Sequence, residues 1–135
     1  MISSNDSVES LVAYIRAYAV EFFENTPVEC NLHIAPTISS KELSGEKRRN
    51  IFLAVKEALN NVLKHSQAKL VTINMDTDHG LLTIQIVDDG VGIDLENRRK
   101  FGNGMNNMKK RIESTNGEFL IENKNGTTLT FRMKL

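Results

Sequence analysis

Apolar residues recur every three or four positions, the spacing of one helix face, in three segments of the chain. Residues suited to cap a helix, Asp6 or Ser7 and then Ser44, precede the first two segments. Asn116-Gly117, a common helix stop, follows the third. The pattern therefore predicts amphipathic helices over residues 7–24, 44–65 and 105–114.

Five further segments alternate apolar and polar residues, which is typical of half-buried strands. Two of them are separated by residues 76–80, which have the composition of a hairpin turn. The strands are expected over residues 28–34, 70–75, 81–87, 118–123 and 127–135. This order of elements favours an α+β fold, a two-layer α/β sandwich in which a mixed sheet of about five strands is covered on one face by about three helices.

Residues 88–104 interrupt the regular pattern. They are rich in glycine, aspartate and asparagine and show neither helical nor strand periodicity. Irregular stretches of this length in compact domains usually form functional lids or are disordered. This segment is therefore expected to be either a functional lid or a disordered stretch.

Composition narrows the classes of protein that fit this fold. The chain of 135 residues suffices for one domain with one core. Its 17 basic residues balance 17 acidic ones, which predicts no binding to nucleic acid and no membrane contact, although a local cationic pocket is compatible with it. The single cysteine, Cys30, can form no intrachain disulfide, which fits a reducing cytoplasm. No apolar run reaches the roughly 18 residues that a transmembrane helix needs, so this segment is expected to be soluble, whatever its parent.

Polar side chains form a line on the second predicted helix, roughly opposite its apolar face. Glu57, Asn61, Lys64 and His65 lie on this line. One interpretation is a solvated helix face, the usual reason for such a pattern. The other is a site for a metal-bound triphosphate, because the amide oxygen of Asn61 suits Mg²⁺ while Lys64 and His65 suit phosphate oxygens. The spacing alone leaves both interpretations open.

Glycines follow the third predicted strand and precede the third predicted helix. Asp88, Gly90 and Gly92 come directly after the strand, where a carboxylate can accept a hydrogen bond from the exocyclic amine of adenine. A plain tight turn is the alternative, since Asp-Gly is a common turn dipeptide. Gly102 and Gly104 precede the helix, whose first N–H groups favour phosphate; a flexible connector is the alternative there. Neither the Walker phosphate loop nor the Rossmann fingerprint is present.

Taken together and in this order, these segments resemble the GHKL ATPase superfamily, which unites gyrase, a heat-shock chaperone, histidine kinases and MutL repair proteins. The resemblance rests on Glu-Ala-Leu-Asn-Asn-Val-Leu-Lys-His at residues 57–65, on Asp-Asp-Gly-Val-Gly-Ile-Asp at 88–94 and on Gly-Asn-Gly-Met-Asn-Asn-Met at 102–108. With Arg111 included, the pattern is similar to sensor histidine kinases related to the nitrate and lipid-fluidity sensors. The resemblance covers about residues 44–135 and implies a Bergerat-type fold.

The resemblance implies a role for each matching residue. Asn61 resembles the Mg²⁺ ligand, and Asp88 the carboxylate that reads adenine, with Thr127 supporting it through water. Glu57 matches the acid that activates water in ATP-hydrolysing relatives and orders the magnesium site in the kinases, and with Lys64 it is the expected catalytic pair. Met105 has the spacing of a core residue as well. The other expected nucleotide contacts are Lys64, His65, Gly90, Gly92, Gly102, Gly104 and Met105.

The resemblance also implies a function. The chain is expected to bind Mg·ATP and to donate its γ-phosphate to a histidine on a separate dimerisation domain of the same parent, from which the phosphate passes to a response regulator. Residues 1–25 would be the end of the transmitter helix or its linker, and 26–135 the ATP-binding catalytic domain, on the cytoplasmic side of an inner-membrane sensor protein. None of His33, His65 and His79 has the helical His-Asp or His-Glu context of a phosphoacceptor.

Two other classes of function fit the same motifs. The first is an anti-sigma-factor serine kinase or an ATP hydrolase of the same superfamily, since Glu57 stands four residues before Asn61, the spacing that the hydrolases use. The second is a non-catalytic module that acts by docking to a partner. Such modules usually lack the magnesium asparagine or the adenine aspartate, and both are present here.

Overall fold

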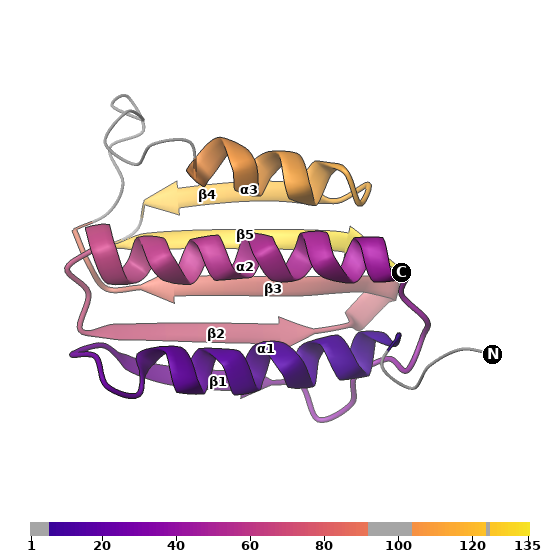
Figure 1. Cartoon of the computed structure of the whole chain (residues 1–135), viewed down its shortest axis with the longest axis horizontal. Helices are drawn as coiled ribbons and strands as arrows, with labels where there is room; N and C mark the ends of the chain where they lie inside the picture. Colours follow the sequence, from indigo (N-terminus) through magenta and orange to yellow (C-terminus); the bar gives the residue numbers. More distant parts are fainter. Residues whose placement is uncertain (1–5, 92–103, 124) are drawn as a thin grey trace.

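The structure is a computed structural model, which describes residues 6–91, 104–123 and 125–135, and only the backbone of His65. Three α-helices, one short 3-10 helix and five strands make up this described part of the chain (Figure 1). Their order is α1 (Val8–Phe23), β1 (Glu29–Ile34), α2 (Gly45–His65), β2 (Leu70–Asp76), η1 (Asp78–Gly80), β3 (Leu81–Asp88), α3 (Gly104–Glu113), β4 (Glu118–Asn123) and β5 (Thr127–Lys134).

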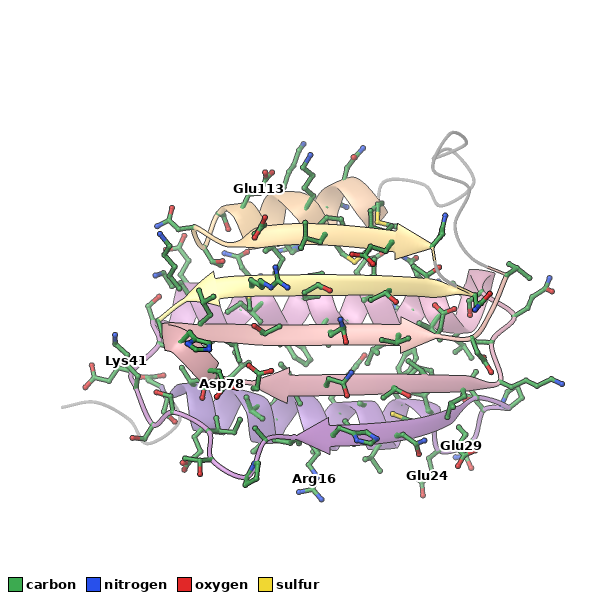
Figure 2. The ribbon with its side chains drawn as sticks, turned by 180° about the vertical axis from the view of Figure 1, so that it is seen from behind. Arg16, Glu24, Glu29, Lys41, Asp78 and Glu113 are labelled. Atoms are coloured by element: carbon green, nitrogen blue, oxygen red, sulfur yellow. The ribbon has the colours of Figure 1, made fainter. Side chains whose placement is uncertain are left out.

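The strands form one sheet in the order β1-β2-β3-β5-β4. β1 and β2 are parallel, and every other neighbouring pair is antiparallel. The three α-helices lie side by side over one face of this sheet (Figure 1), and Figure 2 shows the other face, which no helix in the described residues covers. The predicted α+β sandwich with a mixed five-stranded sheet is confirmed.

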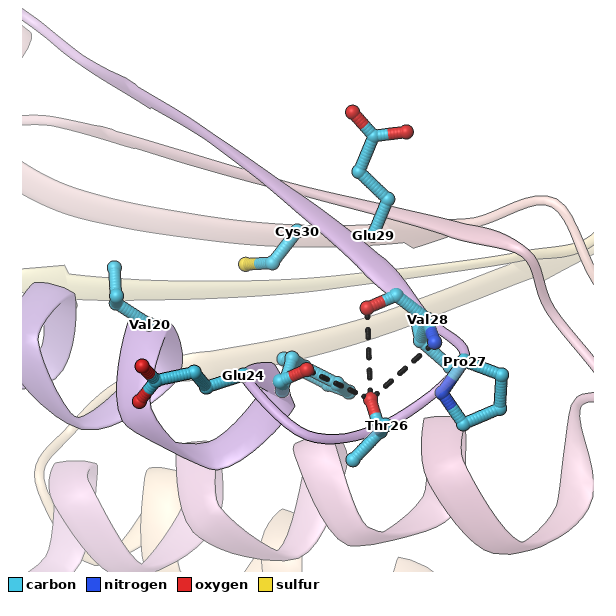
Figure 3. Close-up of a pocket in the computed structure, with 8 residues that line it drawn as sticks. Val20, Glu24, Thr26, Pro27, Val28, Glu29 and Cys30 are labelled. Carbon is cyan, nitrogen blue, oxygen red and sulfur yellow. Dashed lines mark hydrogen bonds between the residues drawn. The ribbon is translucent and has the colours of Figure 1, made fainter.

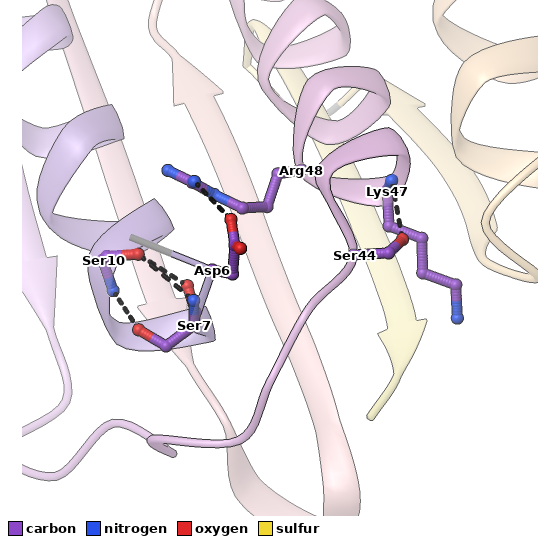
Figure 4. Close-up of polar contacts among 6 residues, drawn as sticks. All are labelled: Asp6, Ser7, Ser10, Ser44, Lys47 and Arg48. Atoms are coloured by element: carbon purple, nitrogen blue, oxygen red, sulfur yellow. Dashed lines mark hydrogen bonds and ion pairs between the residues drawn. The ribbon is translucent and has the colours of Figure 1, made fainter. Parts of the chain in front are cut away.

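Side-chain caps fix where the first two helices begin (Figure 4). The hydroxyl of Ser7 accepts a hydrogen bond from the backbone N–H of Ser10 at 3.1 Å, and Ser10 reciprocates, so Ser7 is the cap that opens α1. Ser44 accepts from the backbone N–H of Lys47 at 3.2 Å and opens α2, as predicted. The ends of the two helices that carry these caps are also joined by an ion pair of 3.6 Å between Arg48 and Asp6.

The layer of helices and the sheet enclose one apolar core. The expected alternation is confirmed in β2 and β3, where every second residue is buried under the helices. α1 belongs to this core, since six of its side chains are buried: Val8, Leu11, Val12, Ile15, Ala19 and Phe23. The origin of residues 1–25 in a transmitter segment stays a prediction. In the described ranges no helix combines the length and the apolar character needed to cross a bilayer.

Candidate functional site

Asp88 is the last residue of β3 and is 6% exposed. In the pairing of β3 with β5 it stands opposite Thr127, the first residue of β5. Its Oδ1 accepts hydrogen bonds from the backbone N–H groups of Gly90 at 2.9 Å and Thr127 at 3.4 Å. Oδ2 accepts none from the residues that the structure describes. The strand register therefore brings together two predicted site residues that lie 39 positions apart in sequence.

The surroundings of Asp88 favour its neutral form. Burial raises the pKa of its carboxyl above the ordinary value, the N–H groups of Gly90 and Thr127 lower it, and the neighbouring Asp89 raises it again. The hydroxyl of Thr127 is also buried, and it has no hydrogen-bond partner among the described residues. Buried polar groups are nearly always paired, so an unpaired hydroxyl beside a half-satisfied carboxylate indicates a place for a polar ligand or an ordered water.

Asp89, by contrast, has a structural role, which its place in the sequence pattern did not reveal. It is exposed, and its Oδ1 accepts from the backbone N–H groups of Lys69 at 2.8 Å and Leu70 at 3.0 Å. These two bonds, that to Leu70 foremost, lower the pKa of the Asp89 carboxyl. The backbone N–H of Asp89 donates to the carbonyl of Leu70 at 3.2 Å. Asp89 thus anchors the glycine loop to the start of β2, while Asp88 faces the candidate site.

We expect Asp89→Ala to lower the melting temperature at neutral pH, because two backbone N–H groups lose their acceptor. The pKa of Asp89 is lower in the folded chain, so its stabilisation is present above the pKa of an unfolded aspartate and is lost as pH falls through the folded-state value. The difference between wild type and variant should therefore shrink in acid, as followed by thermal unfolding at stepped pH. Asp89→Asn retains an acceptor and serves as the control. A pH-independent difference would contradict this role.

Gly90 is required by close packing. A Cβ on Gly90 would overlap the backbone carbonyl of Ser66, which is the C-cap of α2. The φ of Gly90 lies outside the left-handed region, so this close approach, and not a positive φ, is what requires a glycine here. The loop that follows Asp88 is thereby pressed against the end of α2.

The polar line on α2 is only partly exposed. Asn61 is 8% exposed, and its Nδ2 has no hydrogen-bond partner in the described part of the chain. Glu57 is half-buried and Lys64 is exposed. The interpretation as a solvated face is wrong for Asn61, because its side chain is buried. α3 packs along α2, and Arg111 donates to the side-chain amide oxygen of Asn50 at 3.2 Å.

α3 begins beside Glu57. Gly104 is its first residue, and a Cβ there would overlap Oε1 of Glu57. Met105 is 7% exposed and packs in the core with Met108, as its spacing predicted. Gly92 and Gly102, both predicted site residues, lie outside the described residues, as does the side chain of His65.

Asp88, Thr127, the end of α2 and the start of α3 lie at one end of the sheet, the left end in Figure 1. This end presents a carboxylate, a hydroxyl, a buried amide and the ammonium of Lys64. In the described ranges no group of three or more His, Cys, Asp or Glu could enclose a metal ion. A cation held here by Asn61 would need further oxygen ligands from a phosphate or from water, which is how Mg²⁺ is usually bound.

A pocket of about 450 Å³ lies elsewhere, between the end of α1 and the start of β1 (Figure 3). None of the predicted site residues lines it. Its walls combine apolar side chains with the carboxylates of Glu24 and Glu29, and no cationic side chain from the described ranges lines it. Volume alone therefore does not make it a site for a phosphorylated ligand, and the chemistry at the end of β3 locates the candidate site better.

Comparison with known proteins gives the family. Residues 46–135 match the model of the histidine kinase-, DNA gyrase B- and HSP90-like ATPases. The chain is 38% identical over 78 residues to the sensor histidine kinase DesK of Bacillus subtilis, covering 58% of this chain and 21% of that protein. It is 30% identical over 97 residues to the sensor histidine kinase LiaS of the same organism, covering 72% of this chain and 26% of that protein. The chain thus spans about a quarter or less of these relatives.

Solved structures agree with the fold. The histidine kinase domain of a blue-light activated histidine kinase from Erythrobacter litoralis superposes with a TM-score of 0.78 at 20% identity, over 99% of this chain and 66% of that one. The catalytic domain of histidine kinase ThkA superposes with a TM-score of 0.73 at 14% identity, over 95% of this chain and 93% of that one. By its sequence match and its architecture, the chain belongs to the histidine kinase-, DNA gyrase B- and HSP90-like ATPase family.

Proposed function

We propose that this domain binds Mg·ATP and donates the γ-phosphate to a histidine on a separate dimerisation domain, as the catalytic part of a two-component sensor histidine kinase. A response regulator would then receive the phosphate, and the domain would lie on the cytoplasmic side of a membrane-bound sensor. The observation that carries the proposal is a pair of buried polar groups without a partner among the described residues, the amide nitrogen of Asn61 and the hydroxyl of Thr127, at the end of the sheet that also presents Asp88. The names of the relatives support the choice of a sensor kinase.

In this proposal the adenine amine donates to Oδ2 of Asp88, with Thr127 hydrogen-bonded to the same base through water. The amide oxygen of Asn61 would ligate the magnesium ion, which would neutralise charge on the triphosphate when bound. The buried amide fits this role, since a half-turn of the side chain exchanges its unpaired nitrogen for its oxygen. The remaining contacts with the nucleotide, and the lid that would cover its phosphates, would come from the other predicted site residues. These are Lys64, His65, Gly90, Gly92, Gly102, Gly104 and Met105.

Phosphoryl transfer to a histidine requires mainly positioning and charge neutralisation. The attacking imidazole is nucleophilic when neutral, so this chain has no need to supply a base. Lys64 holds the transferring phosphoryl group, and Glu57 orders the metal site from its place against the first residue of α3. The second candidate, ATP hydrolysis, is favoured by the same carboxylate, because Glu57 is the one acid on this face of α2 near Asn61 in the described structure.

The two functions are separated by supplying the domain with radiolabelled Mg·ATP, with and without the dimerisation domain of its parent protein. If the domain is a kinase, it is expected to label the dimerisation domain, and to release little free phosphate when the dimerisation domain is left out. Glu57→Gln should then reduce labelling. Steady release of phosphate by the isolated domain, abolished by Glu57→Gln, would instead establish a hydrolase, and failure to bind Mg·ATP would exclude both.

A further inference from the structure

The end of α2 and the loop after β3 meet at Ser66. This residue is 6% exposed and is the C-cap of α2. Its hydroxyl donates to the carbonyl of Val62, one turn back, at 2.6 Å and accepts from the backbone N–H of Ala68 at 3.0 Å. Gln67, between them, has a φ of 57°. The hydroxyl therefore closes the last turn of α2 and fixes the sharp turn that leads to β2.

The carbonyl of Ser66 holds the glycine loop from the other side. It accepts a hydrogen bond from the backbone N–H of Val91 at 2.7 Å, and it lies where a Cβ of Gly90 would be. The N–H of Gly90 in turn donates to Oδ1 of Asp88 at 2.9 Å. An unbroken series of contacts thus runs from the last turn of α2, through Ser66, to the carboxylate at the end of β3.

These contacts join two halves of the candidate site. Asp88 and Thr127 form the adenine half, and Asn61 and Lys64, which precede Ser66 by five and two residues, form the metal half. One nucleotide must reach both halves at once. We propose that Ser66 is a positioning residue, which fixes the separation of the two halves and so sets the affinity for a ligand that spans them. The proposal rests on the proposed nucleotide binding.

Substitution of Ser66 should not change the affinity for a ligand that contacts only the adenine half. Asp89 anchors the loop to β2 independently, through the N–H groups of Lys69 and Leu70. Loss of the Ser66 hydroxyl therefore leaves the loop held at Asp89, whereas the last turn of α2 loses the bond to Val62. Loss of the hydroxyl therefore displaces the residues of the metal half, which lie in the last turns of α2, and leaves the adenine half in place.

The test compares two ligands, Mg·ATP, which spans both halves, and adenosine, which reaches only the adenine half. In calorimetric titrations, Ser66→Ala is expected to bind Mg·ATP about tenfold more weakly than wild type and adenosine within about twofold, since one buried hydroxyl hydrogen bond is lost from one half only. Ser66→Thr retains the hydroxyl and should restore the affinity for Mg·ATP.

Ser114→Ala is the matched control. Its hydroxyl donates to the carbonyl of Arg111 at 2.6 Å near the end of α3, so the same kind of bond is removed at a helix end outside the site. Both affinities should equal those of wild type.

Unchanged Mg·ATP affinity in Ser66→Ala would overturn the proposal. Equal weakening of both ligands, or no restoration by Ser66→Thr, would also overturn it, because the serine would then be merely structural. If Ser66→Ala does not fold, Ser66→Cys, which replaces the hydroxyl with a weakly hydrogen-bonding thiol in a side chain of similar shape, must show the same difference between the ligands. A wild-type chain that binds neither ligand would refute the proposed function itself.

Discussion

Asp88→Asn is expected to weaken ADP binding by about 10- to 150-fold, the effect of losing a hydrogen bond to a charged group. The substitution is nearly isosteric. The amide oxygen can still accept from Gly90 and Thr127, which both bond to Oδ1 in the structure. The position of Oδ2 becomes an NH₂ group, which cannot accept from the adenine amine. Calorimetric titration with ADP measures the loss.

The folded domain should not lose stability with this substitution. Burial raises the pKa of Asp88 in the folded chain, so this group favours folding most when it is protonated. Its contribution to the free energy of folding is lost as pH rises from the pKa of an unfolded aspartate through the raised pKa. At any pH above the raised pKa the ionised carboxylate therefore opposes folding, and the neutral amide removes this cost. The melting temperature of the ligand-free variant should be equal to or above that of wild type.

The same shift predicts a pH dependence of binding. As pH falls through the raised pKa of Asp88, the carboxyl gains a proton and wild-type affinity for ADP should decline, while Asp88→Asn should show no such step. A wild-type affinity that falls in parallel with that of the variant would place the titrating group elsewhere. Unchanged ADP affinity in Asp88→Asn would remove Asp88 from the adenine half.

Asn61→Ala is expected to abolish the gain in ATP affinity that Mg²⁺ provides, on the order of 10- to 100-fold for a changed metal environment. In wild type the ratio of dissociation constants for ATP without and with Mg²⁺ measures this gain. Nδ2 of Asn61 has no partner among the described residues, so the substitution breaks no hydrogen bond of that atom in the ligand-free fold. If Asn61→Ala folds but binds ATP equally well with and without Mg²⁺, Asn61 therefore has a role in binding the metal.

Asn60→Ala is the control for this experiment. Asn60 is the preceding residue of α2 and is half-buried, but it lies beside Glu57 and Arg111 in a pocket that does not include Asn61. It should retain the full magnesium effect. If Asn61→Ala retained it as well, the metal assignment would be wrong.

Local patterns predicted most of the fold, because the period of the apolar residues is a property of each segment alone. All five strands and three helices were predicted within two residues of their observed ends. The hairpin between β2 and β3 followed from residues 76–80, in which His79 and Gly80 indeed have positive φ. Asn116, with a φ of 60°, ends α3 as its sequence suggested.

The site was less predictable, since its parts come together only through tertiary contacts. The helical period places Asn61 away from the apolar face of α2, and only tertiary packing, which no helical period reveals, buries it. The proximity of Thr127 to Asp88 depends on the register of two strands, for which the sequence offered a family resemblance alone. The contacts of Ser66 involve its own carbonyl, a group that every residue possesses and that no sequence pattern can single out.

The strand order has a consequence for synthesis on the ribosome. β5 follows β4 in sequence but lies between β3 and β4 in the sheet. Until residues 127–134 leave the exit tunnel, β4 has no neighbour to pair with and β3 is the edge of a three-stranded sheet. The nascent domain therefore acquires Thr127, and with it the hydrogen bond that completes the setting of Asp88, only in the last step of sheet assembly.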